Sequence, residues 1–147
     1  MYKEWDAETA HLTPGAGIVL IRKFKNEWKV LGLLLNGQYD ITKGHVEKGD
    51  SYLDTAIRET YEEADIKELN FVFGYDYCTL DYLRVYMATT TQQAKIKENK
   101  NGFKEHESYS WLSFEEMEEQ TYDYLKPAII WAREKTKTRE KNDQIGR

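Results

Sequence analysis

The chain has 147 residues, of which 40% are hydrophobic, 14% aromatic and 32% charged. These proportions exclude a disordered or fibrous chain and predict a globular one. We expect a single domain over residues 1–147, because this length allows one hydrophobic core and is short for two. The net charge of −5 argues against a broad nucleic-acid surface, since such surfaces are usually basic.

The chain has one cysteine, Cys78, so neither an internal disulfide nor a cysteine zinc cluster can form. The N-terminal stretch MYKEWDAETAHLTPG lacks the apolar run of a signal peptide. No stretch approaches the roughly 20 apolar residues of a membrane span. We therefore expect a cytoplasmic protein with no membrane partner.

The first elements are two strands. Gly15 to Phe24 and Trp28 to Leu35 are apolar or β-branched runs joined by the polar turn 25–27. After the loop 36–38, the segment Ile41 to Asp50 carries two glycines and has no helical periodicity. It is predicted to be a structured loop.

The clearest helix is predicted from Ser51 to Ala64. Nonpolar residues recur there at helical spacing, namely Leu53, Ala56, Ile57, Thr60 and Ala64. Ser51 followed by Asp54 is a helix-start signal of the capping-box kind. The helix should therefore bury one stripe against the sheet.

The second half of the chain predicts three more strands and further helices. The strands are expected at Phe71–Tyr77, Tyr82–Thr89 and Ser108–Leu112. A second helix-start signal follows at Ser113–Glu116, and a last helix should begin near Tyr124 to Pro127. From about Arg133 we expect a charged, solvated and frayed tail. The order of elements predicts an α/β (α+β) fold with a mixed sheet between helices.

Three glutamates on the predicted helix are candidate metal ligands. Glu59, Glu62 and Glu63 fall within an arc of about 100°, beside the apolar stripe. Carboxylates this close repel one another, and a hard cation such as Mg²⁺ or Mn²⁺ is the natural counter-charge. Arg58, one turn from Glu62, could hold a carboxylate in a fixed rotamer.

The alternative is a surface helix whose carboxylates simply face water, and for the helix alone that interpretation is the better one. The preceding loop favours the metal site. Gly44 and Gly49 allow backbone conformations that bring carbonyls and amides close to a metal or a phosphate.

The spacing from Gly44 through Asp50 and Arg58 to Ile66 resembles the Nudix box, a pattern specific to the Nudix hydrolase superfamily. Asp50 stands where that family has glutamate, and Asp65 where it has glycine. Asp50 is one methylene shorter, which puts its reach to Arg58 in question. Asp65 would occupy a left-handed C-terminal cap.

Three motifs resemble the asymmetric diadenosine tetraphosphate hydrolases within that superfamily. They are TKGHVEKGD at 42–50, Glu105-His106, and the pattern Tyr109-x-Trp111-Leu112. The resemblance covers about Gly15 to Ala132. It implies a Nudix-type α/β/α sandwich and hydrolysis of nucleoside polyphosphates by attack of water at phosphorus.

The resemblance implies that Mg²⁺ is bound by Glu59, Glu62 and Glu63, helped by a backbone carbonyl at Lys43 or Gly44. Glu105 would complete the site or position the water. Glu59 and Glu105 are both candidates for the general base, and His106 is taken as structural. Lys43 and His45 match positions that contact the phosphate chain. For the base, stacking candidates are Tyr122, Tyr77 and Tyr82.

The leading hypothesis is hydrolysis of diadenosine tetraphosphate to ATP and AMP. One alternative is another Nudix substrate, either an RNA 5′ end, which the acidic charge disfavours, or a smaller one such as ADP-ribose or a dNTP. The other is a nucleotide-binding module that does not hydrolyse, an interpretation motivated by Asp50 and Asp65.

Overall fold

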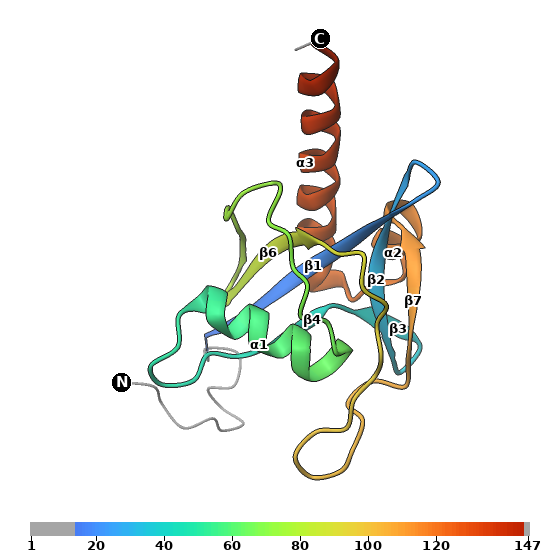
Figure 1. Cartoon of the computed structure of the whole chain (residues 1–147). Coiled ribbons are helices and arrows are strands. Elements are labelled where there is room, and N and C mark those ends of the chain that lie inside the picture. The colour runs from blue at the N-terminus through green and yellow to red at the C-terminus, as the bar shows by residue number, and fades with distance from the viewer. Residues whose placement is uncertain (1–13, 146–147) are drawn as a thin grey trace.

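A mixed seven-stranded sheet lies between helices in the computed structural model, with α1 on one face and α2 and α3 on the other (Figure 1). The structure describes residues 14–145, with side chains described for residues 14–141. The elements are β1 (Gly15–Phe24), β2 (Glu27–Leu35), β3 (Gln38–Asp40), β4 (Thr42–His45), α1 (Tyr52–Ala64), β5 (Cys78–Leu80), β6 (Leu83–Thr89), β7 (Ser108–Ser113), α2 (Phe114–Gln120), the 3-10 turn η2 (Asp123–Leu125) and α3 (Lys126–Ile145). The predicted mixed sheet between helices is confirmed.

Strand β1 lies at the centre of the sheet. One edge pairs in parallel with β6 over residues 15–21. The other edge is shared, because β4 pairs antiparallel with residues 15–18 and β2 with residues 21–24. This arrangement brings β4 beside the first half of β1 and leaves β4 open to α1, with which it is in extensive contact.

The core has one half on each face of the sheet. Alternation along β1 divides its side chains, since Ala16, Ile18 and Leu20 belong to the cluster with α1, while Val19 and Ile21 belong to the cluster with α2 and α3. All five are at most 1% exposed. A strand covered on both faces explains the nearly continuous apolar run in this part of the sequence.

Helix α1 has the predicted start. Ser51 is the N-cap, and its side chain accepts a hydrogen bond from the Asp54 amide at 3.0 Å. The helix ends at Asp65, which adopts the left-handed conformation with φ of 57° and donates its amide hydrogen to the Tyr61 carbonyl. The direction of the chain after α1 therefore depends on an aspartate in a conformation that glycine adopts more easily.

The other helix starts are also confirmed. Ser113 and Glu116 form both halves of a capping box at α2, and Pro127 lies in the first turn of α3. The prediction of a frayed tail from Arg133 is wrong, because α3 continues to Ile145. Contacts with distant segments hold it, since Arg133 pairs with Glu115 and Arg139 donates to a carbonyl in the loop after α1.

Two other predictions differ from the structure. The expected strand 71–77 is a loop, in which Gly74 has φ of 92° and Phe71 stacks on Tyr75 with ring centroids 4.9 Å apart. The strand comes later, as β5. The loop predicted at 41–50 contains β4, which forms because β1 offers it a free edge. Neither β3 nor β4 exceeds four residues, and such short strands carry little periodicity.

None of the helices within residues 14–145 is long and apolar enough to cross a membrane. Most of the N-terminal stretch interpreted from the sequence, residues 1–13, lies outside the described residues.

Candidate metal centre

The contact between β4 and α1 positions the predicted ligands. Thr42 and Thr60 are joined by a buried hydrogen bond of 2.7 Å between their hydroxyls. One residue along, the Lys43 amide donates to Glu63 Oε1 at 2.8 Å. The backbone of β4 therefore holds one carboxylate of α1 directly, and the helix cannot turn about its axis without breaking a buried hydrogen bond.

Gly44 allows the next close approach. A Cβ atom added at this position would overlap the Glu59 carboxylate. The absence of a side chain at Gly44 therefore gives Glu59 its place against β4, which is a steric reason for glycine here. The conformation of Gly44 is not itself one that requires glycine, because its φ is negative.

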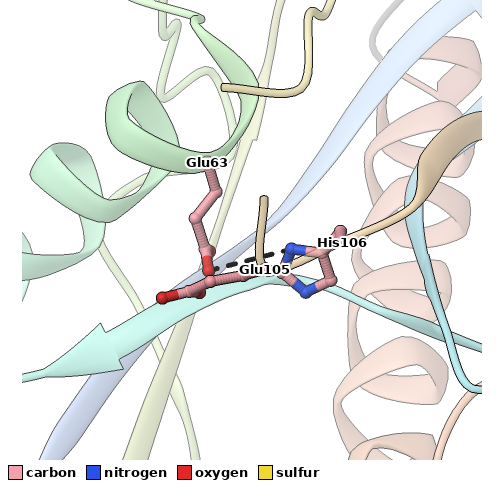
Figure 2. Close-up of side chains that lie close together, drawn as sticks. All are labelled: Glu63, Glu105 and His106. Atoms are coloured by element: carbon pink, nitrogen blue, oxygen red, sulfur yellow. Dashed lines mark ion pairs between the residues drawn. The ribbon is translucent and has the colours of Figure 1, made fainter. Parts of the chain in front are cut away.

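The structure brings the four predicted acidic residues together. Glu59, Glu62 and Glu63 come from α1, and Glu105 comes from the loop before β7. Ligand atoms of Glu63, Glu105 and the neighbouring His106 lie within 4.8 Å of one another, and Figure 2 shows the three side chains converging. All these residues line a cavity of about 340 Å³, whose lining also includes the segment 96–101. We call it the hairpin cavity, because this segment leads into a hairpin closed by the bridge between Glu98 and Lys104.

The electrostatics of this cluster favour a bound cation. Burial, together with the charge of Glu62, raises the pKa of Glu59 to about 7. Burial and the hydrogen bond with Glu105 raise the pKa of Glu63 well above its ordinary value. The protein alone therefore supplies too little positive charge for these carboxylates, although Arg58 lies beside them.

The donors suit a hard divalent cation. Glu59, Glu62, Glu63 and Glu105 offer carboxylate oxygens, which Mg²⁺ and Mn²⁺ prefer. A cation would also offset the burial and the repulsion that together raise the pKa values of Glu59 and Glu63. The residues present therefore fit the group that the sequence predicts.

Arg58 lies where the sequence places it, beside several acidic groups. Its guanidinium is 3.4 Å from carboxylate oxygens of Glu59 and Glu62 and donates to the His45 carbonyl at 3.3 Å. The Asp50 carboxylate lies 3.6 Å from Arg58 Nε. This nitrogen is buried and makes no hydrogen bond within the described part of the chain. The shorter side chain at position 50 thus forms an ion pair but no hydrogen bond.

The structure shows a buried polar network behind the carboxylates that the sequence interpretation missed. Asp40 is 4% exposed and accepts from Lys43 Nζ at 3.0 Å, while its other neighbour, His106 Nε2, is 3.1 Å away. The opposite ring nitrogen of His106 lies 4.0 Å from Glu63. Asp40 stands between two nonpolar residues in the sequence, and this was the only signal of its burial. His106, taken as structural, links Asp40 to the metal centre.

A second cavity, of about 520 Å³, adjoins the same carboxylates. We call it the lysine cavity, and its lining includes Lys43, Gly44, His45, Glu59, Tyr82, Glu105 and Tyr124. Burial alone would lower the pKa of Lys43, but Asp40 and Tyr124 raise it, so the ammonium stays charged. A fixed positive charge and the carboxylates therefore share one cavity.

The structure separates the predicted stacking tyrosines. Tyr82 lines the lysine cavity. Tyr77 instead packs on Tyr86, with ring centroids 5.6 Å apart, and the Tyr122 hydroxyl donates to the Leu35 carbonyl at 2.8 Å. Neither lines either of the two cavities. Tyr124, which the sequence interpretation missed, lines the lysine cavity, and only its position two residues after Tyr122 pointed to it.

Replacing Gly44 by alanine should displace Glu59 while leaving the fold intact, because the new methyl group meets a flexible side chain. We expect G44A to bind Mn²⁺ or Mg²⁺ roughly tenfold or more weakly than the wild type. Calorimetry would measure the affinity and thermal unfolding would verify the fold. An unchanged affinity would contradict the proposed position of Glu59.

Replacing Asp50 by glutamate should let the carboxylate reach Arg58 Nε. Because both side chains are partly exposed, we expect a gain of about 0.5–1 kcal/mol in the free energy of unfolding. Denaturant unfolding of D50E would measure it. The matched control is D50N, which removes the charge without adding length and should lose stability. If D50E and the wild type were equally stable, the missing hydrogen bond at Arg58 Nε would not lower the free energy of unfolding.

Metal affinity should depend on pH through Glu59. Its pKa is raised on folding, so the proton contributes stability to the metal-free protein below about pH 4.5, and this contribution is lost as the pH rises through about 7. A cation must displace that proton. Apparent Mg²⁺ affinity should therefore fall at least roughly tenfold per pH unit below 7, because the raised pKa of Glu63 adds a second proton to displace. Calorimetry at pH 6, 7 and 8 in buffers of different ionisation enthalpy would count the protons released, and a flat profile would refute the prediction.

Comparisons with known proteins identify the family of this chain. The model of the NUDIX domain matches residues 9–132. Two curated relatives, both asymmetrical bis(5′-nucleosyl)-tetraphosphatases, match over 86 residues, at 35% identity for the pig protein and 31% for the mouse protein. The match covers 50% of this chain, and the chain spans about half (54%) of the length of these relatives.

A solved structure of a C. elegans Ap4A hydrolase in a binary complex superposes with a TM-score of 0.65 at 19% identity, covering 88% of this chain and 98% of that one. At this identity, the similarity concerns the fold alone. The family model covers most of the chain and includes the four acidic residues of the metal centre. The chain therefore belongs to the NUDIX domain family.

Proposed function

We propose that the protein hydrolyses a phosphoanhydride bond of a dinucleoside polyphosphate, with Mg²⁺ as cofactor. Diadenosine tetraphosphate is the substrate that we favour, with ATP and AMP as products. The supporting observation is that the charged Lys43 and the acidic residues Glu59 and Glu105 line one cavity. A polyphosphate needs such a pairing, because a lysine and a divalent cation can share its negative charge. The pig and mouse relatives support this choice of substrate.

The divalent cation, when bound, would polarise phosphoryl oxygens and lower the pKa of the attacking water. Glu59 is our first candidate to accept the proton of that water, because its carboxylate lines both cavities at the proposed metal centre. Glu105 is the second candidate. Arg58 would act on Glu59 and Glu62 by holding their carboxylates in place.

Lys43 and His45 would bind the phosphate chain, since both line the lysine cavity. Asp40 keeps the Lys43 ammonium in place at 3.0 Å. The aromatic rings of Tyr82 and Tyr124 are available for a base in the same cavity, and stacking on one ring would contribute about 1–3 kcal/mol.

A substrate panel tests the proposal. With Mg²⁺, diadenosine tetraphosphate should be cleaved faster than ADP-ribose, dNTPs or 5′-triphosphorylated RNA, and ¹⁸O-labelled water would identify the phosphorus attacked. We expect E62Q to lower kcat by about a hundredfold or more, equivalent to about 2.7 kcal/mol. The matched control is E119Q, the same change on α2 on the opposite face of the sheet. The proposal fails if diadenosine tetraphosphate stays intact while another substrate is cleaved.

Two alternatives have distinct outcomes in the same panel. The lysines of the segment 95–104 favour an RNA 5′ end, and a steep salt dependence confined to RNA turnover would support that substrate. A nucleotide-binding module without activity would bind the panel compounds and cleave none. If E62Q left measured turnover unchanged, the assignment of the metal centre would be wrong.

A further inference from the structure

The segment 97–104 forms a hairpin between β6 and β7, seen in Figure 1 as the long loop that leads into β7. The side chain of Asn99 organises it, because Oδ1 accepts hydrogen bonds from the amides of Asn101 and Phe103 at 2.9 and 3.1 Å. The Asn99 amide donates to the Phe103 carbonyl at 2.7 Å. The hairpin therefore has a shape determined by its own residues.

This hairpin forms one wall of the hairpin cavity, and the carboxylates of α1 form the other. Glu59 and Glu105 line both the hairpin cavity and the lysine cavity. The metal centre thus lies at the junction of two cavities. A substrate whose reacting phosphorus lies at that junction would extend into both of them.

The hairpin cavity carries groups suited to a nucleotide. Lys97 is already engaged, since its ammonium lies 3.6 Å from Asp65 Oδ1 and 3.6 Å from the Tyr61 ring centroid. Lys100 also lines the cavity, and it makes no ion pair with any residue of the described part of the chain. The amide side chain of Asn101 and the half-buried Ile96 add a polar and an apolar surface. In a bound nucleotide, the cation would contact a phosphate and the amide would hydrogen-bond the base or the ribose. The apolar surface would contact the hydrocarbon parts of the nucleotide.

We propose that the hairpin cavity binds the second nucleotide of a dinucleoside polyphosphate, and that Lys100 and Asn101 determine specificity for substrates with a nucleoside at both ends. This inference rests on the proposed function, because the first nucleotide would occupy the lysine cavity. The volume of about 340 Å³ is in the range of small-molecule sites.

The experiment compares diadenosine tetraphosphate with adenosine 5′-tetraphosphate, which has the same phosphate chain and no second nucleoside. We expect the double variant K100A/N101A to lower kcat/KM for diadenosine tetraphosphate about tenfold and to leave the value for adenosine tetraphosphate within about twofold. The matched control is K104A, which removes the same charge from the same hairpin at a residue that does not line the cavity. It should change neither value.

Calorimetry with a methylene-bridged, uncleavable diadenosine tetraphosphate gives a second readout, in which the double variant should bind about tenfold more weakly than wild type. An unchanged affinity, an equal loss for both substrates, or an equal loss in K104A would overturn the inference. If the wild type cleaves neither compound, the proposed function fails, and the calorimetry still decides whether the hairpin cavity binds a second nucleotide.

Discussion

The buried contact between β4 and α1 is the constraint on which the metal centre depends. The amide of Lys43 holds Glu63, and the missing side chain of Gly44 makes room for Glu59. Both restraints come from consecutive residues of a four-residue strand, which itself exists because β1 leaves half of one edge free. Pairing within the sheet therefore determines where the carboxylates lie, although none of them is in the sheet.

This placement has an electrostatic cost. Glu63 is 8% exposed and lies beside Glu105, while Glu59 is close to Glu62, so burial and like charge both oppose ionisation. A surface helix with the same residues would leave its carboxylates in water and keep their ordinary pKa values. The raised pKa values therefore suit the proposed cation site, and binding of a cation there would stabilise the fold.

The sequence predicts those parts of the site that depend on neighbouring residues along the chain. Helical spacing puts the three glutamates on one side of α1, and the start signals at Ser51 and Ser113 correspond to real caps. The network of Asp40 and His106 could not be predicted in this way, because its members are 66 residues apart and meet only through the sheet. Similarly, Tyr124 rather than Tyr122 reaches the lysine cavity because the turn before α3 orients them differently.

The same network also bears on the position of Glu105, the proposed ligand that lies in a loop. Glu105 is exposed and follows directly on the hairpin, where a loop residue would ordinarily be poorly positioned. The next residue, His106, is 3% exposed and held by Asp40. Glu105 therefore lies between the hairpin on its N-terminal side and a buried, hydrogen-bonded neighbour on its C-terminal side, and that neighbour restrains its backbone.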